Sequence, residues 1–286
     1  GCLDVASRPI VAVGRFDNSS AYTHLMPEKW RNISDALDGV ALCDPVPLSA
    51  LPAANLLALA AAESPGLHVL ALGPLTNLWA AAEMSQGAFF NNVGRLVLMG
   101  GALFMPGNVP GGKAEWNLFG DTQAAHEVLS GPTCPSPPSP LSSRCALAHR
   151  TVMVGLAPTE AVPLSALFDA TVGLEPATPA ARFILQAIQC ATAHSYQFLY
   201  DPVAAAVLLN RAGADTITVG LCVSLEDGST AVCCDPVYGT PDSTDAPFPP
   251  CMPCESMPAP ACMPRVVRSI DTDEYISTVT RLISTV

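Results

Sequence analysis

The chain has 286 residues, of which 50% are hydrophobic and 13% are charged, so a disordered chain is excluded and a sizeable core is expected. Its 13 Lys and Arg side chains against 25 Asp and Glu give a net charge of −12. This charge disfavours nucleic acid as a partner, because phosphate backbones are also negative. No apolar run approaches the roughly 18 residues of a membrane-spanning helix, so we expect a soluble globular protein with no membrane partner.

The cysteines and the start of the chain bear on its compartment and completeness. Eleven cysteines cannot all pair within the chain. Five of them lie in one Pro-rich stretch, and the other six are scattered, as the buried thiols of cytosolic proteins are. We therefore expect a cytoplasmic protein. The sequence starts at Gly1 without a signal-peptide pattern, which indicates a fragment or a processed form.

Apolar, β-rich runs alternate with helix-like runs along the chain. Nearly continuous apolar strands separated by helices predict an α/β fold with a mostly parallel central sheet and helices on both faces. In such sheets ligands bind beyond the carboxyl ends of the strands, so the polar residues that follow each strand are candidate ligand-binding residues. The predicted strands are residues 9–13, 68–72, 95–99, 151–154 and 216–219, and the predicted helices are residues 51–63, 78–84, 122–129, 180–197, 202–212 and 273–283.

Two short tracts hold half of the 28 prolines, five within Pro132–Pro140 and nine within Pro236–Pro264. Proline lacks the N–H group that helix interiors and strand ladders need. We interpret the tracts as unstructured surface insertions, at about residues 132–144 and 233–264, in a single domain that spans residues 1–286. The second tract carries Cys251-Met-Pro-Cys254. This pattern would suit a soft metal, but without a second C-x-x-C pair an unstructured loop is favoured.

Four polar residues after the predicted strands have a simple explanation as helix caps. Either Thr76 or Asn77 is placed to accept hydrogen bonds from the first free N–H groups of the helix that follows. Asp121 precedes another helix-like run, and a cap role accounts for it fully. Asp201 stands before Pro202, and proline favours the first helical position. On these patterns alone, capping is the favoured role of each residue.

The loop after residues 95–99 is long and rich in glycine, and it carries Asn108, Glu115 and Asn117. Glycines allow a backbone to approach a ligand closely. The loop matches neither common phosphate-binding glycine pattern. Two amides and a carboxylate instead suit a neutral polyol such as a sugar, and the alternative is a turn-rich loop with solvated polar residues. The five histidines form no zinc or catalytic-triad pattern.

Taken in order, these motifs resemble the inosine–uridine-preferring nucleoside hydrolases. The resemblance covers most of residues 8–286 outside the two Pro-rich tracts, and it includes a last strand and helix from Arg265 onward. The motifs are Ala71-Leu-Gly-Pro-Leu-Thr-Asn-Leu78, Val97-Leu-Met-Gly-Gly101, Pro106-Gly-Asn108, Ala114-Glu-Trp-Asn117, Asp121 with Ala124-Ala-His126, and Leu199-Tyr-Asp-Pro202.

The resemblance implies a Rossmann-like nucleoside hydrolase fold, a nucleoside substrate, and cleavage of the N-glycosidic bond of purine, and also pyrimidine, nucleosides to ribose and free base. It also implies Ca²⁺ as cofactor and allows a homo-oligomer. Through it, the Thr76 carbonyl and Asp201 correspond to calcium ligands. Tyr200 stands where pyrimidine-accepting relatives carry histidine, and its ring would stack on a purine. The residues that correspond to the ribose pocket are Met99, Asn108, Glu115 and Asn117.

One departure from the family pattern limits the expected activity. The opening D-x-D-x-x-x-D-D motif, which supplies the catalytic base and most calcium carboxylates of the family, does not occur in the sequence. We therefore assign no catalytic residue and expect that an N-terminal portion is missing. Two other readings stay open: a family member that binds ribosides without catalysis, and an α/β interaction protein that works through its Cys-rich loop.

Overall fold

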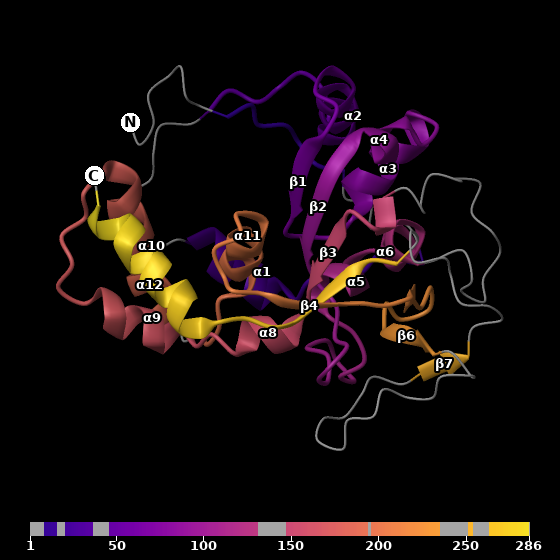
Figure 1. Cartoon of the computed structure of the whole chain (residues 1–286). Coiled ribbons are helices and arrows are strands. Elements are labelled where there is room, and N and C mark those ends of the chain that lie inside the picture. The colour runs from indigo at the N-terminus through magenta and orange to yellow at the C-terminus, as the bar shows by residue number, and fades with distance from the viewer. Residues whose placement is uncertain are drawn as a thin grey trace.

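The computed structural model describes residues 9–15, 21–36, 46–130, 147–193, 196–234, 251–253 and 263–285. At its centre lies a five-stranded sheet in the order β1-β2-β3-β8-β4 (Figure 1). The first four strands in this order run parallel, and β4 pairs antiparallel to β8 at the edge. The predicted mostly parallel sheet is confirmed. The strands are β1 (Leu67–Ala71), β2 (Val93–Met99), β3 (Thr151–Val154), β8 (Arg265–Ser269) and β4 (Asp215–Thr218).

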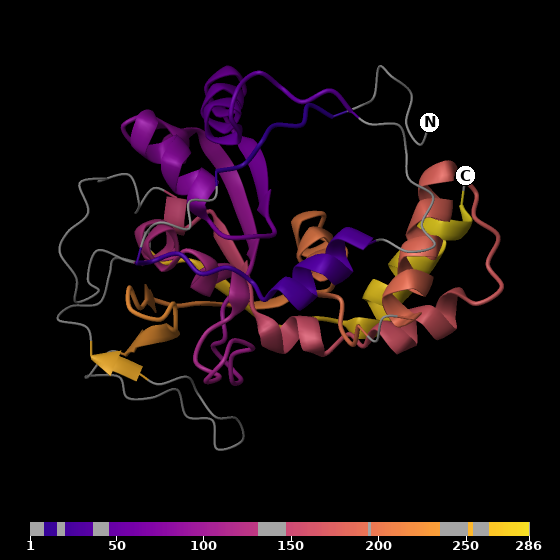
Figure 2. The same cartoon turned by 180° about the vertical axis from the view of Figure 1, so that it is seen from behind.

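Helices cover both faces of this sheet, as Figures 1 and 2 show. Alternate residues of β2 point to opposite faces, so Leu96 and Leu98 belong to one buried cluster while Val97 and Met99 belong to the other. The first cluster includes residues of α2 (Ala53–Glu63), α3 (Thr76–Met84), α4 (Ala88–Asn92) and α6 (Thr122–Leu129). The second includes residues of α8 (Leu156–Glu160), α9 (Leu164–Thr171), α10 (Pro179–Ala193), α11 (Tyr200–Leu208) and α12 (Thr272–Ser284).

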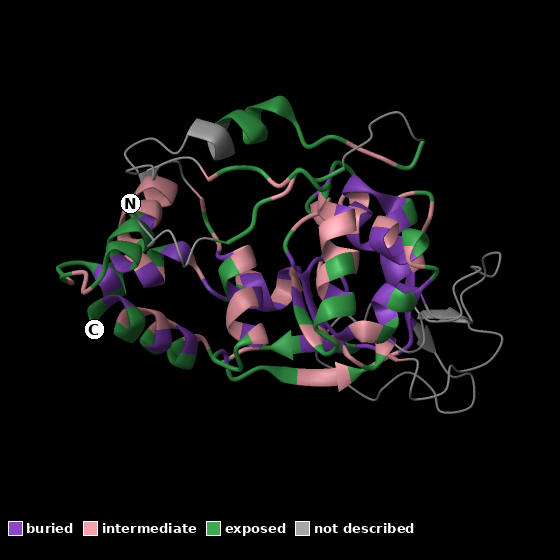
Figure 3. Cartoon of the chain, turned by 90° about the horizontal axis from the view of Figure 1, so that it is seen from above, coloured by how far each residue is buried: buried purple, intermediate pink, exposed green. Residues whose placement is uncertain are grey.

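Burial explains why the central strands read as continuous apolar runs. All four residues of β3, and Leu96 to Met99 of β2, are buried. Figure 3 shows the buried residues concentrated between the sheet and its helices, whereas the described part of α1 (Glu28–Ala36) is exposed. No helix within the described residues is long and apolar enough to cross a membrane.

A second, three-stranded sheet lies beside the first and was not predicted. It consists of β5 (Leu221–Val223), β6 (Thr230–Cys234) and β7 (Cys251–Pro253). The second Pro-rich tract therefore contains regular structure that we did not expect, because β7 pairs with β6. Cys222 in β5 is disulfide-bonded, so the expectation of a free thiol is wrong at that position.

Two further expectations have different outcomes. The apolar run at residues 9–13 was predicted as a strand, but it forms only an isolated bridge between Val11 and Leu48. Ile10 and Val13 are exposed, so this run lacks the burial that keeps strands in the sheet. The first Pro-rich tract, at about residues 132–144, lies outside the described residues.

Candidate functional site

A cavity of about 550 Å³ opens at the carboxyl ends of β1 and β2. Three segments contribute most of its wall: the ends of these strands, the loop that leads into α5 (Trp116–Gly120), and the start of α11. The lining residues are Met26, Trp30, Leu72, Met99, Asn108, Glu115, Trp116, Asn117, Tyr196, Gln197, Phe198, Tyr200 and Asp201.

Glu115 is the buried carboxylate of this pocket, with 3% of its surface exposed. It is the N-cap of α5, where its side chain accepts from the N–H groups of Asn117 at 2.9 Å and Leu118 at 3.4 Å. It also accepts from the Gly101 N–H at 3.3 Å. Burial raises the pKa of Glu115 to about 7, the backbone hydrogen bonds oppose this shift, and the charge of Asp201 adds to it.

The loop before α5 is shaped by one close backbone approach. A Cβ atom on Gly107 would lie 2.0 Å from the Ala114 carbonyl oxygen, so only glycine fits there. The Asn108 side chain accepts from the Trp116 N–H at 3.1 Å, and the Asn117 amide donates to the Met99 carbonyl at 3.0 Å. Both amides are thus held in fixed positions at the pocket wall.

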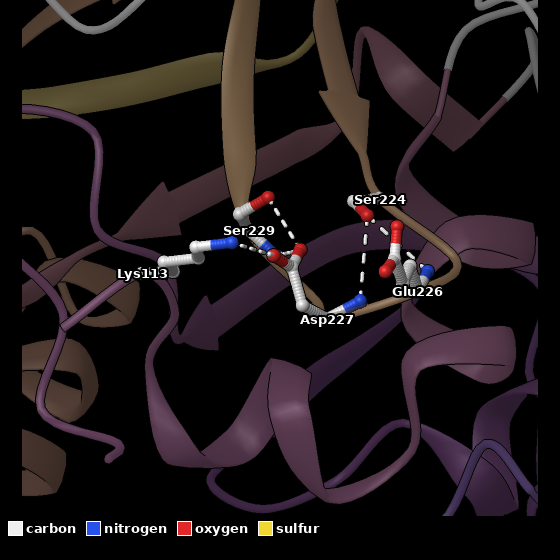
Figure 4. A network of polar contacts seen from close by, with 5 residues as sticks. All are labelled: Lys113, Ser224, Glu226, Asp227 and Ser229. Atoms are coloured by element: carbon white, nitrogen blue, oxygen red, sulfur yellow. Dashed lines mark hydrogen bonds and ion pairs between the residues drawn. The ribbon is translucent and has the colours of Figure 1, made fainter. Parts of the chain in front are cut away.

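The same loop is tied to the turn between β5 and β6 (Figure 4). Lys113 lies 3.5 Å from Asp227, whose carboxylate also accepts from the Ser229 hydroxyl at 2.6 Å. Against the effect of burial, hydrogen bonds from Ser229, Ser224 and Lys113 hold the pKa of Asp227 below its usual range. Asp227 therefore stays charged and keeps the turn next to the glycine-rich loop.

Tyr200 and Asp201 are the first two residues of α11, which begins two residues before the predicted start at residue 202. The N-cap is Leu199, without a side-chain cap bond, so the predicted cap role of Asp201 is wrong. Asp201 lies in the first turn, and burial raises its pKa to about 6. The Tyr200 hydroxyl donates to Glu160 at 3.2 Å. Burial and the nearby Glu160 both raise the pKa of this phenol.

Thr76 is the one predicted site residue that is not among the residues lining this cavity. It is the first residue of α3, whose N-cap is Leu75, so neither Thr76 nor Asn77 has the predicted cap role. The Thr76 hydroxyl donates to Asp121 at 2.7 Å. Asp121 caps α6 by accepting from the Ala124 N–H at 2.9 Å, as predicted. The structure therefore brings together Met99, Asn108, Glu115, Asn117, Tyr200 and Asp201 in one cavity, whereas Thr76 is not among the lining residues.

With the pocket in place, residues 15–276 match the family described as inosine-uridine preferring nucleoside hydrolase. The chain belongs to this family. It is 40% identical over 100 residues to probable uridine nucleosidase 2 of Oryza sativa subsp. japonica, covering 34% of this chain and 29% of that protein. It is 46% identical over 69 residues to uridine nucleosidase 1 of Arabidopsis thaliana, covering 24% of this chain and 20% of that protein. The matched part is thus less than a third of these curated relatives.

Solved nucleoside hydrolases share the fold. The inosine-uridine preferring nucleoside hydrolase from Bacillus anthracis has a TM-score of 0.65 and 21% identity, over 98% of this chain and 82% of that one. The purine-preferring ribonucleoside hydrolase from Gardnerella vaginalis has a TM-score of 0.60 and 18% identity, over 96% and 79%. These likenesses confirm the predicted α/β architecture of a nucleoside hydrolase.

The calcium that the family resemblance implies does not fit the described residues alone. Among them, no group of three or more His, Cys, Asp or Glu side chains is placed to hold a metal ion. Ca²⁺ takes six to eight oxygen ligands. The Glu115 carboxylate already accepts hydrogen bonds from backbone N–H groups. Asp201 is the other carboxylate among the residues lining the pocket. The described residues therefore support no catalytic step through a metal ion.

Sequence reasoning missed the aromatic side of the pocket. Tyr196 and Phe198 line it together with Tyr200, and the Phe198 and Tyr200 rings meet edge to face at 6.2 Å. The run Tyr196-Gln-Phe-Leu-Tyr200 directly before Asp201 was a visible signal for this wall. Trp30 and Met26 reach the pocket from α1 and the segment before it. No motif marked those two residues.

Proposed function

We propose that the pocket binds a ribonucleoside, and that the whole protein hydrolyses the N-glycosidic bond of purine nucleosides to ribose and free base. One observation carries the proposal: polar groups and aromatic rings line the same cavity. Glu115, Asn108 and Asn117 suit sugar hydroxyls, whereas Phe198 and Tyr200 offer ring surfaces to a base. A volume of about 550 Å³ lies in the range of small-molecule sites.

The preference for purines rests on Tyr200. Because its hydroxyl donates to Glu160, the proton is already engaged, and the ring is the part left to meet a base. Stacking favours the larger purine ring system. The curated plant relatives are named uridine nucleosidases, and the Gardnerella vaginalis enzyme is named purine-preferring. Uridine is therefore the competing substrate.

Calorimetric titration of residues 1–286 with inosine and with uridine tests the binding proposal. We expect inosine to bind more tightly, and Tyr200→Ala to weaken inosine more than uridine. Tyr200→Phe, which keeps the ring, is the matched control and should bind inosine as the parent does. Tighter uridine binding would overturn the purine preference alone. Absence of binding by either nucleoside would overturn the assignment of the pocket.

We further propose that residues 1–286 do not hydrolyse nucleosides by themselves. The sequence lacks the D-x-D-x-x-x-D-D cluster, so no positioned base activates water. Incubation with inosine, adenosine or uridine and Ca²⁺ should release no ribose, and clear turnover would contradict this. A riboside-binding protein without catalysis is the alternative for the whole protein. A longer chain that contains the cluster and still shows no turnover would favour that alternative.

Calcium belongs to the same proposal for a longer chain. There Asp201 would add one carboxylate ligand, and Asp201→Asn should weaken calcium binding markedly because a charged ligand is lost. Calcium affinity measured by calorimetry on such a chain tests this. An unchanged affinity would remove Asp201 from the ligand set.

A further inference from the structure

A second cavity, of about 290 Å³, lies at the amino ends of the parallel strands, whereas the nucleoside pocket lies at their carboxyl ends. Arg95, Val152 and Arg265 reach it from positions near the amino ends of β2, β3 and β8. Thr216 of β4 and Glu274 of α12 complete its polar lining together with Asn210. Neither the family resemblance nor the proposed function gives these residues a role in binding or catalysis.

The strand register places both arginines on one face of the sheet. Val97 pairs with Val152, and Val152 pairs with Arg265. Arg95 precedes Val97 by two residues and therefore points to the same face. The two side chains thus project toward α11 and α12 with only β3 between their strands. Arg268, three residues after Arg265, points to the other face, where it pairs with Asp215 at 2.5 Å.

The two guanidinium groups have no anionic partner among the described residues. Arg95 donates to the Leu208 and Val207 carbonyls at 3.1 Å and to the Asn210 side chain at 3.0 Å, all neutral groups. Burial and the charge of Arg265 lower the pKa of Arg95. The Arg265 side chain makes no hydrogen bond or ion pair within the described part of the chain. Glu274 lines the cavity without an ion pair to either arginine.

We propose that this cavity binds a small tetrahedral oxyanion of the phosphate or sulfate class, held by Arg265 and by the field of Arg95. A guanidinium group matches the geometry of such oxyanions. The Thr216 hydroxyl is a further donor in the lining. The cavity lies at the small end of the range for ligand sites, which suits an inorganic ion. Because the chain carries a net charge of −12, binding of an anion requires this local arrangement.

The test is calorimetric titration of residues 1–286 with inorganic phosphate and, separately, sulfate, at an ionic strength held constant with chloride. Arg265→Gln removes one charged hydrogen-bond donor set and should weaken binding at least about tenfold. Arg268→Gln is the matched control, because it removes the same charge from the same strand on the opposite face. It should change the affinity less than about twofold. Circular dichroism checks that both variants fold.

A third variant changes affinity in the other direction. Glu274→Gln removes a carboxylate from the lining and should tighten sulfate binding several-fold, since sulfate is fully ionised and only repelled by that group. Binding of neither ion beyond the chloride control would overturn the proposal. Equal weakening by Arg265→Gln and Arg268→Gln would also overturn it, because the effect would then reflect overall charge. Inosine affinity should be the same in all three variants, which separates this site from the nucleoside pocket.

Discussion

Glu115 and Asp201 bring two carboxylates into one partly dehydrated cavity, and each keeps its proton to a higher pH than an exposed acid does. Their pKa values are raised to about 7 and about 6, mainly because burial disfavours the charged form. Each carboxylate therefore destabilises the folded chain at neutral pH, although it supplies a polar group to the pocket lining. Raised carboxyl pKa values in a pocket are typical of functional sites.

The sign of the resulting pH dependence follows from linkage. Because the folded chain holds these protons at pH values where the unfolded chain has released them, the free energy of unfolding falls as pH rises from about 4.5 to about 7. We expect a combined loss on the order of 4 kcal/mol over this window, measured by urea unfolding with a chelator present. Glu115→Gln should flatten the profile, whereas Glu63→Gln, on an exposed residue of α2, should not. An unchanged profile in Glu115→Gln would contradict the burial argument.

The predictions of helix caps at single residues show where sequence reasoning ends. Asp121 was assigned correctly because one of its carboxylate oxygens accepts from the Ala124 N–H, while the other accepts from the Thr76 hydroxyl. Asp201 was assigned wrongly because proline needs no N–H partner anywhere in the first helical turn. Pro202 therefore marks the turn without fixing the first residue, and α11 starts at Tyr200. The predicted cap role of Thr76 was wrong because its hydroxyl donates to Asp121, a residue 45 positions away in the sequence.

The glycine-rich loop depends on contacts that are distant in sequence. Its residue types suggested a polyol site, but its support comes from the β5–β6 turn more than one hundred residues later. Thr230 accepts from the Ala102 N–H at 3.1 Å, next to the Gly101 N–H that donates to Glu115. No local pattern contains this pairing, so the sequence could not predict it.

Gly107 should be indispensable for the shape of this loop. In Gly107→Ala the added methyl group would clash with the Ala114 carbonyl oxygen, so the loop must move together with Asn108. We expect inosine affinity to fall at least about tenfold and thermal stability to fall as well. Gly73→Ala is the control, because a Cβ there meets nothing within 4 Å. Equal inosine affinity in the two variants would show that the loop does not shape the pocket.

The two links between the loop and the β5–β6 turn should differ in strength. Lys113 is 73% exposed, so Lys113→Ala should cost less than about 1 kcal/mol of unfolding free energy. Thr230 is 4% exposed, and Thr230→Val leaves the Ala102 N–H without its acceptor, which should cost about 1–2 kcal/mol. Urea unfolding of both variants measures the difference. A larger loss in Lys113→Ala would mean that the ion pair, and not the buried hydrogen bond, holds the loop.

For the molecule as a whole, the parallel core was predictable and the second sheet was not. Leu96–Met99 of β2 and Val152–Val154 of β3 are buried. These runs are apolar throughout because both faces of the sheet are covered there, and this property is local. The sheet of β5, β6 and β7 is built from short strands within or beside a tract rich in proline and cysteine. Its pairing depends on contacts between segments whose composition argues against strands.

The first Pro-rich tract should be dispensable for folding. Deletion of residues 133–143 should leave the melting temperature within a few degrees, because each doubling of loop length changes the closure free energy by only about 0.6 kcal/mol. Differential scanning calorimetry of the shortened chain against the parent measures this. A failure to fold would show that the tract packs against the core.

The order of strands in the central sheet also determines when neighbouring strands can pair during translation. β3 lies between β2 and β8, yet Arg265 leaves the ribosome more than one hundred residues after its partner Val152. At a translation rate of about 5–20 residues per second, one edge of β3 stays unpaired for roughly 6–20 s until β8 is synthesised. During that interval the nascent chain exposes an apolar strand edge that can pair with other chains. Demand for chaperones is therefore greatest while residues 155–264 are being translated, and it ends when β8 closes the sheet.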